Sequence, residues 1–311
     1  DQGSSGPWTV GGFHEFIKKE ATTDVRCFVS ANLAGALMGG MEGTTLHGPN
    51  MTRVEEIVKA YERYPHMICG IKSHGESGGL SHWDTEVLEQ AIEAGERCGI
   101  PLYVHTGELF PVDDANLPSV ESVVQKVLDV VRPDDVIAHV YSNMPDGVVG
   151  QATNVPPWVK AAFQRGIKFD IGYGINFSYR IARLMLEQGL PPSTISSDIH
   201  GDFNSYHDLS QLDYSLAGAF NQLLALGLPM VEAIKCLTYS PAQVLKSEQE
   251  IGTLSVGSVA DITVLESHSV DHELCDSEGE NITLSEAWIP VQVFKDGTSH
   301  QTDPNMFPDL I

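Results

Sequence analysis

Four residues that could hold or serve a divalent metal ion each follow a short run of mostly apolar or small residues. They are Lys72, His105, His139 and Asp198. Two neutral imidazoles can hold a divalent ion, and a lysine and a carboxylate complete a set that suits metal-assisted hydrolysis. If the runs are parallel β-strands of a barrel, their C-terminal ends point to one face. The sequence therefore predicts that the four side chains meet at one hydrolytic metal site.

The elements that must position these residues alternate between two patterns. Short β-rich runs are followed by stretches with apolar residues at helical spacing, which predicts parallel βαβ units. The predicted strands are 25–33, 67–72, 102–105, 136–139, 167–171 and 194–198, and the predicted helices are 12–19, 51–64, 82–98, 120–131, 158–164, 179–188, 209–226 and 230–246. These patterns predict an α/β fold of the (β/α)8 TIM-barrel type. Two further strands are expected before Val25, the second ending near Asp1.

The pattern changes after Leu245. Residues 251–265 and 291–297 have the alternation and glycine turns of short strands, and residues 266–281 are polar and predicted to be a loop. We therefore predict a metal-dependent hydrolase barrel over residues 1–248 and a small β-sandwich module over residues 249–311.

Composition limits the possible partners. The 311 residues include 42% hydrophobic ones and carry a net charge of −24, so the chain is globular and its surface repels nucleic acid and anionic lipid. Five scattered cysteines, with no CxxC pair, favour a reduced, cytoplasmic protein. The sequence contains no uncharged apolar run that is long enough to predict a membrane helix. We expect a small-molecule substrate and leave the oligomeric state open, a homo-oligomer included.

Each candidate ligand has a structural alternative. Lys72 could reach solvent at the barrel rim, or its amine could lose its proton and add carbon dioxide, giving a carbamate that bridges two metals. Asp198 could cap the following segment, or it could bind one metal and pass a proton from activated water to the leaving group. His105 and His139 would each be structural if they were alone, whereas together they favour a metal site.

Several other residues are weaker candidates for the site. Tyr173, Gly174 and His200 are candidate substrate-binding residues, because they follow predicted strands and glycine allows close approach of the backbone. The alternatives are that the glycines only form a turn and that His200 is a surface residue. Glu108 could accept a hydrogen bond from His105 and so orient that ring as a metal ligand. His74 and His82 flank a glycine-rich stretch, and each could be either a ligand or a surface residue.

The motifs around these residues resemble those of the amidohydrolase superfamily, and within it the dihydroorotase-related deacetylase subgroup. The motifs are Gly70–Lys72, Val104–Glu108, Ile137–His139, Phe169–Gly174 and Ile195–His200, with the tail Gly252–Ile262. The resemblance covers nearly the whole chain up to about Leu265, and the Lys, His, His, Asp order makes it specific.

The resemblance implies a metal-dependent hydrolase of amide or ester bonds, usually with two zinc ions. It implies that carboxylated Lys72 bridges the two Zn²⁺, and that His105 and His139 hold the more exposed one. Asp198 would then be both a ligand and the general acid/base. The expected activity is removal of an acyl group from a small N- or O-acylated compound by metal-activated hydroxide.

Two departures from the subgroup affect this interpretation. The His-x-His pair that ends the family's first barrel strand occurs nowhere in this sequence. We expect an N-terminally truncated barrel that lacks its first strand and keeps a remnant of the sandwich. The alternative is a true loss of the pair, which would leave one metal or none and an inactive chain. Tyr173 also stands where subgroup members often carry histidine.

Two other functions are compatible with these residues. A dihydroorotase-like cyclic amide hydrolase would need basic groups for a substrate carboxylate. Arginine is scarce near the predicted strand ends, with Arg180 the nearest, so deacylation is favoured. A non-catalytic barrel that lost its metals but kept its pocket is the alternative from another class of protein.

Overall fold

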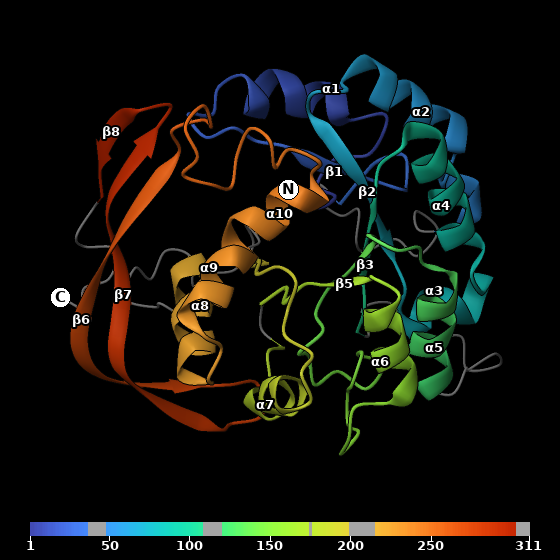
Figure 1. Cartoon of the computed structure of the whole chain (residues 1–311). Helices are drawn as coiled ribbons and strands as arrows, with labels where there is room; N and C mark the ends of the chain where they lie inside the picture. The colour runs from blue at the N-terminus through green and yellow to red at the C-terminus, as the bar shows by residue number, and fades with distance from the viewer. Residues whose placement is uncertain (37–47, 108–119, 174–175, 199–214, 303–311) are drawn as a thin grey trace. The chain divides into compact units, whose positions relative to one another are not determined.

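The computed structural model describes residues 1–36, 48–107, 120–173, 176–198 and 215–302 (Figure 1). The chain divides into two compact units. The first unit contains Asp1–Ala138 and Met144–Lys168. The second contains His139–Asn143 and Phe169–Ile311. The predicted domain boundary between residues 248 and 249 stays a prediction.

A parallel sheet lies at the centre of the first unit. Its order is β1-β2-β3-β4-β5, with the pairs from β1 to β4 in parallel register. The strands are β1 (Cys27–Ser30), β2 (Ile68–His74), β3 (Leu102–His105), β4 (Val136–Ile137) and β5 (Lys168–Phe169). Five of the six predicted strands therefore form, and the predicted α/β class is confirmed.

The first residues of the chain continue this sheet beyond β1. Gln2 and Phe28 form a parallel bridge, and the carbonyl of Asp1 accepts a hydrogen bond from Phe28 N at 2.8 Å. The Ser5 carbonyl accepts another from Ser30 N at 2.8 Å. This pairing agrees with the expectation of a strand that ends near Asp1.

Helices cover this sheet in the first unit. They are α1 (Val10–Phe13), a π-helix (His14–Lys18), a 3₁₀-helix (Pro49–Met51), α2 (Val54–Arg63), α3 (Ser77–Trp83), α4 (Glu86–Cys98), α5 (Val120–Val130) and α6 (Pro157–Gln164). Helix α4 packs against β2 and β3 with Leu88, Ala91 and Ala94 buried, and α2 lies beside it (Figure 1). The helix predicted over 82–98 is two helices, because Asp84 takes a positive φ of 49° and ends α3.

The helices of the second unit are α7 (Tyr179–Glu187), α8 (Leu216–Ala225), α9 (Met230–Leu237) and α10 (Tyr239–Val244). The single helix predicted over 230–246 breaks at Thr238, whose φ and ψ of −128° and −83° are not helical. The strand predicted over 194–198 forms only one parallel bridge, between Asp170 and Thr194. In the parts of the chain listed above, no helix is long and apolar enough to cross a membrane.

An antiparallel sheet forms the C-terminal part of the second unit. Its order is β6-β7-β8, with β6 (Ile262–Cys275), β7 (Asn281–Lys295) and β8 (Thr298–Gln301), and β6 and β7 form a long, bent hairpin (Figure 1). The prediction of a polar loop over 266–281 was wrong up to residue 275. Most β6 side chains are exposed or half-exposed, so polar residues fit this strand while the ladder with β7 holds its backbone. The strands predicted within 251–261 are irregular instead.

The five cysteines all carry free thiols. Cys27 and Cys236 are buried, and burial raises the pKa of each thiol to about 12. Buried thiols of this kind pack as small hydrophobic side chains.

A buried carboxylate joins the starts of β3 and β4. Asp135 is 1% exposed and accepts hydrogen bonds from Leu102 N at 2.8 Å and Arg132 N at 2.8 Å. The Arg132 guanidinium adds two more, from Nε at 3.1 Å and Nη2 at 2.9 Å. Four donors therefore satisfy both oxygens and fix the relation between the two strands.

We predict that Asp135→Ala lowers the free energy of unfolding by about 3–5 kcal/mol, because it leaves a largely buried arginine charge and a strand N–H without a partner. Urea denaturation measures the loss. Glu232→Ala is the matched control, since it removes the exposed i,i+3 pair with Lys235, and it should cost less than about 0.5 kcal/mol. Similar losses in the two variants would contradict this account.

Candidate active site

Lys72 lies near the C-terminal end of β2 and is only 9% exposed. Its Nζ lies 4.7 Å from the centroid of the Tyr103 ring, the cross-strand neighbour on β3. Gly3 packs so closely that a Cβ there would lie 2.6 Å from Lys72 Cγ. The amine is thus held in a crowded, partly aromatic setting instead of extending into solvent at a barrel rim.

His105 ends β3, the strand that pairs with β2, which carries Lys72. Its Nε2 lies 3.1 Å from the Gly107 carbonyl oxygen, which can only accept, so Nε2 carries the proton in the neutral ring and Nδ1 carries the lone pair. His74 is the register partner of His105, and the two rings lie 5.5 Å apart. The first unit therefore brings Lys72, His74 and His105 together at adjacent strand ends.

A small cavity of about 20 Å³ lies beside these residues in the first unit, with Lys72 and His74 among its lining residues. It is also lined by Thr52 and Ser73, whose buried hydroxyls have no hydrogen-bond partner among the described atoms. Glu76, also on the lining, is fully buried and caps α3 through Gly78 N and Gly79 N. A polar space of this size suits one ordered water.

His139 lies two residues after β4, in the second unit, and is 8% exposed. Its Nδ1 lies 2.8 Å from the carbonyl oxygen of Gly172. Because a carbonyl only accepts, Nδ1 is the protonated nitrogen of the neutral ring and Nε2 carries the lone pair. Metal-binding histidines commonly donate their other N–H to a carbonyl in this way, so the donor chemistry of His139 fits a metal ligand.

The hydrogen bond between His139 and the carbonyl of residue 172 favours glycine at position 172. Its φ is +49°, and a Cβ there would lie 2.6 Å from His139 Nδ1. His139 itself has a φ of +60°, and Asp198 has a φ of +51°. Two of the four predicted ligands therefore occupy left-handed backbone conformations, which are uncommon outside glycine and cluster at functional sites.

A buried carboxylate links the Gly172 segment to the segment that leads to Asp198. Asp170 is 1% exposed and accepts from Gly172 N at 2.9 Å and from the hydroxyls of Thr194 and Ser196. Within the second unit, this network holds the carbonyl that orients His139 in a fixed relation to residues 194–196.

Tyr173 adds a second link in this network. Its backbone N donates to the Ser196 carbonyl at 2.9 Å, and its hydroxyl pairs with Gln222 on α8. The side chain is 7% exposed and its ring centroid lies 5.1 Å from that of Phe177. Its role as a substrate contact stays a prediction.

The predicted site residues divide between the two units. Lys72 and His105 belong to the first, and His139 and Asp198 to the second. The meeting of all four at one site stays a prediction. Gly174 and His200, with Glu108, lie outside the described residues. Over the part of the chain that is described, no group of three or more His, Cys, Asp or Glu side chains gathers as a metal cluster.

Two residues at these strand ends were not assigned from the sequence. The period of two along a strand could have shown that His74 shares a face with Lys72. Asp170 lies inside a motif that was recognised, but its role depends on hydroxyls at 194 and 196 that only the folded chain brings to it. No local pattern identifies that contact.

Comparison with known proteins finds a family model, curated relatives and solved structures that are similar to this chain. The Amidohydrolase family model matches residues 166–299. A deacetylase of Brucella anthropi is 26% identical over 291 residues, which is 93% of this chain and 68% of the relative. This similarity extends over both units.

Solved structures share the fold. A dihydroorotase structure superposes with a TM-score of 0.82 at 24% identity, over 97% of this chain and 75% of that one. An adenine deaminase structure gives a TM-score of 0.81 at 22% identity, over 96% and 77% of the two chains. At these identities the likeness concerns the fold alone.

We predict that Gly172→Ala lowers the free energy of unfolding by about 3 kcal/mol, because it adds a clash with the His139 ring to the cost of a left-handed alanine. Gly189→Ala is the matched control in the same unit, with a φ of +71° and no atom within 4 Å of the added Cβ. It should cost only about 1 kcal/mol. Urea denaturation compares the two, and equal losses would show that the His139 contact is unimportant.

Proposed function

We propose that the chain is a member of the amidohydrolase superfamily, and that it is a metal-dependent hydrolase that removes an acyl group from a small N- or O-acylated compound. The deacetylase name of the relative supports deacylation as the reaction. The observation that carries the proposal is the setting of His139, whose Nδ1 proton is committed to the Gly172 carbonyl. This hydrogen bond gives the other nitrogen the lone pair that a metal ligand needs.

Four residues would hold the metal in this proposal. They are carboxylated Lys72, His105, His139 and Asp198. Zinc accepts nitrogen and carboxylate ligands of these kinds. When bound, divalent ions would polarise the scissile carbonyl and activate water at neutral pH.

The other steps belong to the chain's own residues. Asp198 takes the proton of the attacking water and delivers it to the leaving nitrogen or oxygen, and positioned carboxylates serve this role in many hydrolases. The Asp170 network holds the segment before Asp198, so its carboxylate does not have to be ordered anew in each turnover. Tyr173, Gly174 and His200 are the proposed substrate contacts.

The contacts of Arg180 favour deacylation over cyclic amide hydrolysis. Arg180 was the nearest candidate for a substrate carboxylate, but its guanidinium pairs with Glu278 at 3.3 Å. A cation already neutralised by a carboxylate is a poor anchor for a second one. This pairing removes the main basic group that a dihydroorotase-like substrate would require.

We predict that Asp198→Asn lowers kcat for N-acyl amino acids or O-acyl hydroxy acids by about 10²–10⁴-fold, because the amide cannot move the proton. Asparagine tolerates a left-handed backbone, so the fold should survive. Asp134→Asn is the matched control, since Asp134 also has a positive φ, of 70°, but its exposed side chain pairs with Lys168 at the surface. Steady-state kinetics on the active full-length protein make the comparison, and an active Asp198→Asn variant would contradict the assigned role.

We predict that exhaustive chelation abolishes this activity and that added Zn²⁺ restores it, because the metal supplies the Lewis acid. The matched measurement is the zinc content per chain before and after treatment. Full activity in protein shown to be metal-free would exclude the proposed reaction class.

A further inference from the structure

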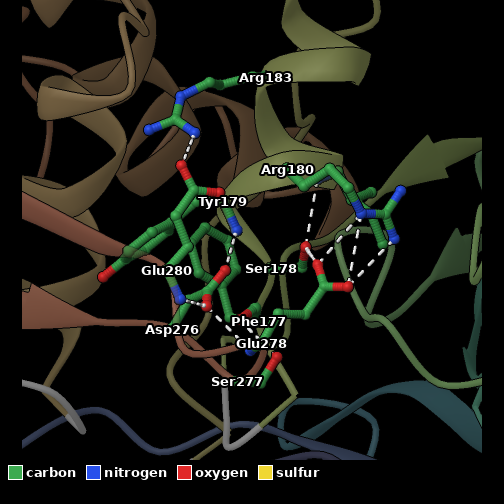
Figure 2. A network of polar contacts seen from close by, with 10 residues as sticks. Phe177, Ser178, Tyr179, Arg180, Arg183, Asp276, Ser277, Glu278 and Glu280 are labelled. Atoms are coloured by element: carbon green, nitrogen blue, oxygen red, sulfur yellow. Dashed lines mark hydrogen bonds and ion pairs between the residues drawn. The ribbon is translucent and has the colours of Figure 1, made fainter. Parts of the chain in front are cut away.

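The turn between β6 and β7, residues 276–280, is unusually well ordered by its own hydrogen bonds. Asp276 Oδ1 accepts from Glu278 N at 2.9 Å and from Glu280 N at 2.8 Å. Asp276 N in turn donates to the Glu280 carbonyl at 2.9 Å. One carboxylate oxygen therefore closes the turn, and the other is directed elsewhere (Figure 2).

The turn forms hydrogen bonds with the chain where α7 begins. Asp276 Oδ2 accepts from Tyr179 N at 2.7 Å, at the first residue of that helix. Ser277 donates twice to the Phe177 carbonyl, from its backbone N at 3.1 Å and from its Oγ at 2.8 Å. Segments about 100 residues apart in sequence are thus joined by three hydrogen bonds to backbone atoms (Figure 2).

Two ion pairs lie beside these hydrogen bonds. Glu278 pairs with Arg180 and also accepts from the Ser178 hydroxyl, and Glu280 pairs with Arg183 (Figure 2). The Arg183 and Glu280 side chains are both 40% exposed, and pairs this exposed contribute little to stability. The backbone contacts of Asp276 and Ser277 are therefore the part of the network that fixes position.

The Phe177–Ser178 segment is connected to His139 by further hydrogen bonds. Phe177 and Ser142 form an antiparallel bridge, and Ser178 N donates to the Tyr141 carbonyl at 2.9 Å. Ser142 N donates to the carbonyl of His139 itself at 3.0 Å. From Phe177 and Ser178 to His139 the path is made of backbone hydrogen bonds, which have less freedom than side-chain contacts. All of these residues belong to the second unit.

We propose that Asp276 and Ser277 are positioning residues for the His139 imidazole. By holding the Phe177–Ser178 segment, they keep the chain after His139 in the one path that allows its left-handed backbone and its bond to Gly172. The inference rests on the proposed function, in which His139 binds the metal. It adds that the β6–β7 turn sets the geometry of that ligand.

The test compares side chains of the same turn in the full-length protein. Asp276→Ala removes the bond to Tyr179 N together with the two bonds that close the turn, whereas Glu280→Ala removes the same charge from the turn and the pair with Arg183. The first readout needs no metal or substrate: the ¹⁵N shifts of His139 in metal-free, histidine-labelled protein at pH 8, assigned with His139→Gln. We expect one tautomer, with the proton on Nδ1, in the unmodified protein and in Glu280→Ala, and a mixture in Asp276→Ala.

The second readout is zinc affinity by chelator competition, together with kcat and KM. We expect Asp276→Ala to lose about tenfold in zinc affinity and kcat, at the lower end of what removing supporting partners costs, with KM changed less than twofold. Glu280→Ala should stay within twofold in all three. Unchanged tautomer and affinity in Asp276→Ala, or equal losses in both variants, would overturn the inference.

Ser277 provides a second variant pair if Asp276→Ala does not fold. Ser277→Ala removes only the Oγ bond to Phe177 and should show the same changes in smaller measure, and Ser277→Thr should restore them. No change in Ser277→Ala would overturn the inference. Unmodified protein that binds no zinc would contradict the proposed function instead, while the tautomer comparison would still decide whether the turn positions His139.

Discussion

The hydrogen bond between His139 Nδ1 and the Gly172 carbonyl is the constraint on which the candidate site depends. It selects one tautomer of the ring, and it requires residue 172 to lack a side chain, because a Cβ would lie 2.6 Å from the same nitrogen. The donor and the acceptor come from the segments that follow two different strands. A change in either segment that breaks this bond would free the ring to take the other tautomer.

This arrangement is strained, and buried polar contacts hold it. The left-handed backbones of His139 and Asp198 each cost of the order of 1 kcal/mol or more. Asp170 offsets this cost within the same unit, because its buried carboxylate accepts three hydrogen bonds from the two segments involved. Charge-assisted bonds to a buried carboxylate are among the stronger ones in proteins. Strain and stabilisation thus occur next to each other, as expected where a site needs a fixed geometry.

The sequence predicted the parallel strands and their terminal polar residues well, because both follow from local patterns. Lys72 and His105 could be placed at adjacent strand ends from apolar runs and helical spacing alone. The limits lie in contacts between distant segments. Nothing near Gly172 reveals that its carbonyl meets His139, and the left-handed backbone of His139 has no signal in residue type. The polar stretch 266–275 was mistaken for a loop because a hairpin strand exposed on most of its residues has no buried face to give alternation. Local sequence patterns therefore do not predict contacts that depend on pairing between distant segments.

The C-terminal hairpin also has a core of its own, which explains how a turn can hold a site segment without being part of the barrel sheet. Leu274, Leu284, Ala287 and Ile289 are buried together next to the turn, and Asn221 on α8 exchanges two hydrogen bonds with the backbone of Trp288 on β7. The strands on both sides of residues 276–280 are therefore anchored by contacts that do not depend on those between the turn and α7. An anchored turn loses little conformational entropy when its acceptors engage the Phe177–Tyr179 backbone, so those bonds can restrain that segment. On this argument the small sheet belongs functionally with the segment after β5, because the rigidity that reaches His139 originates in the hairpin.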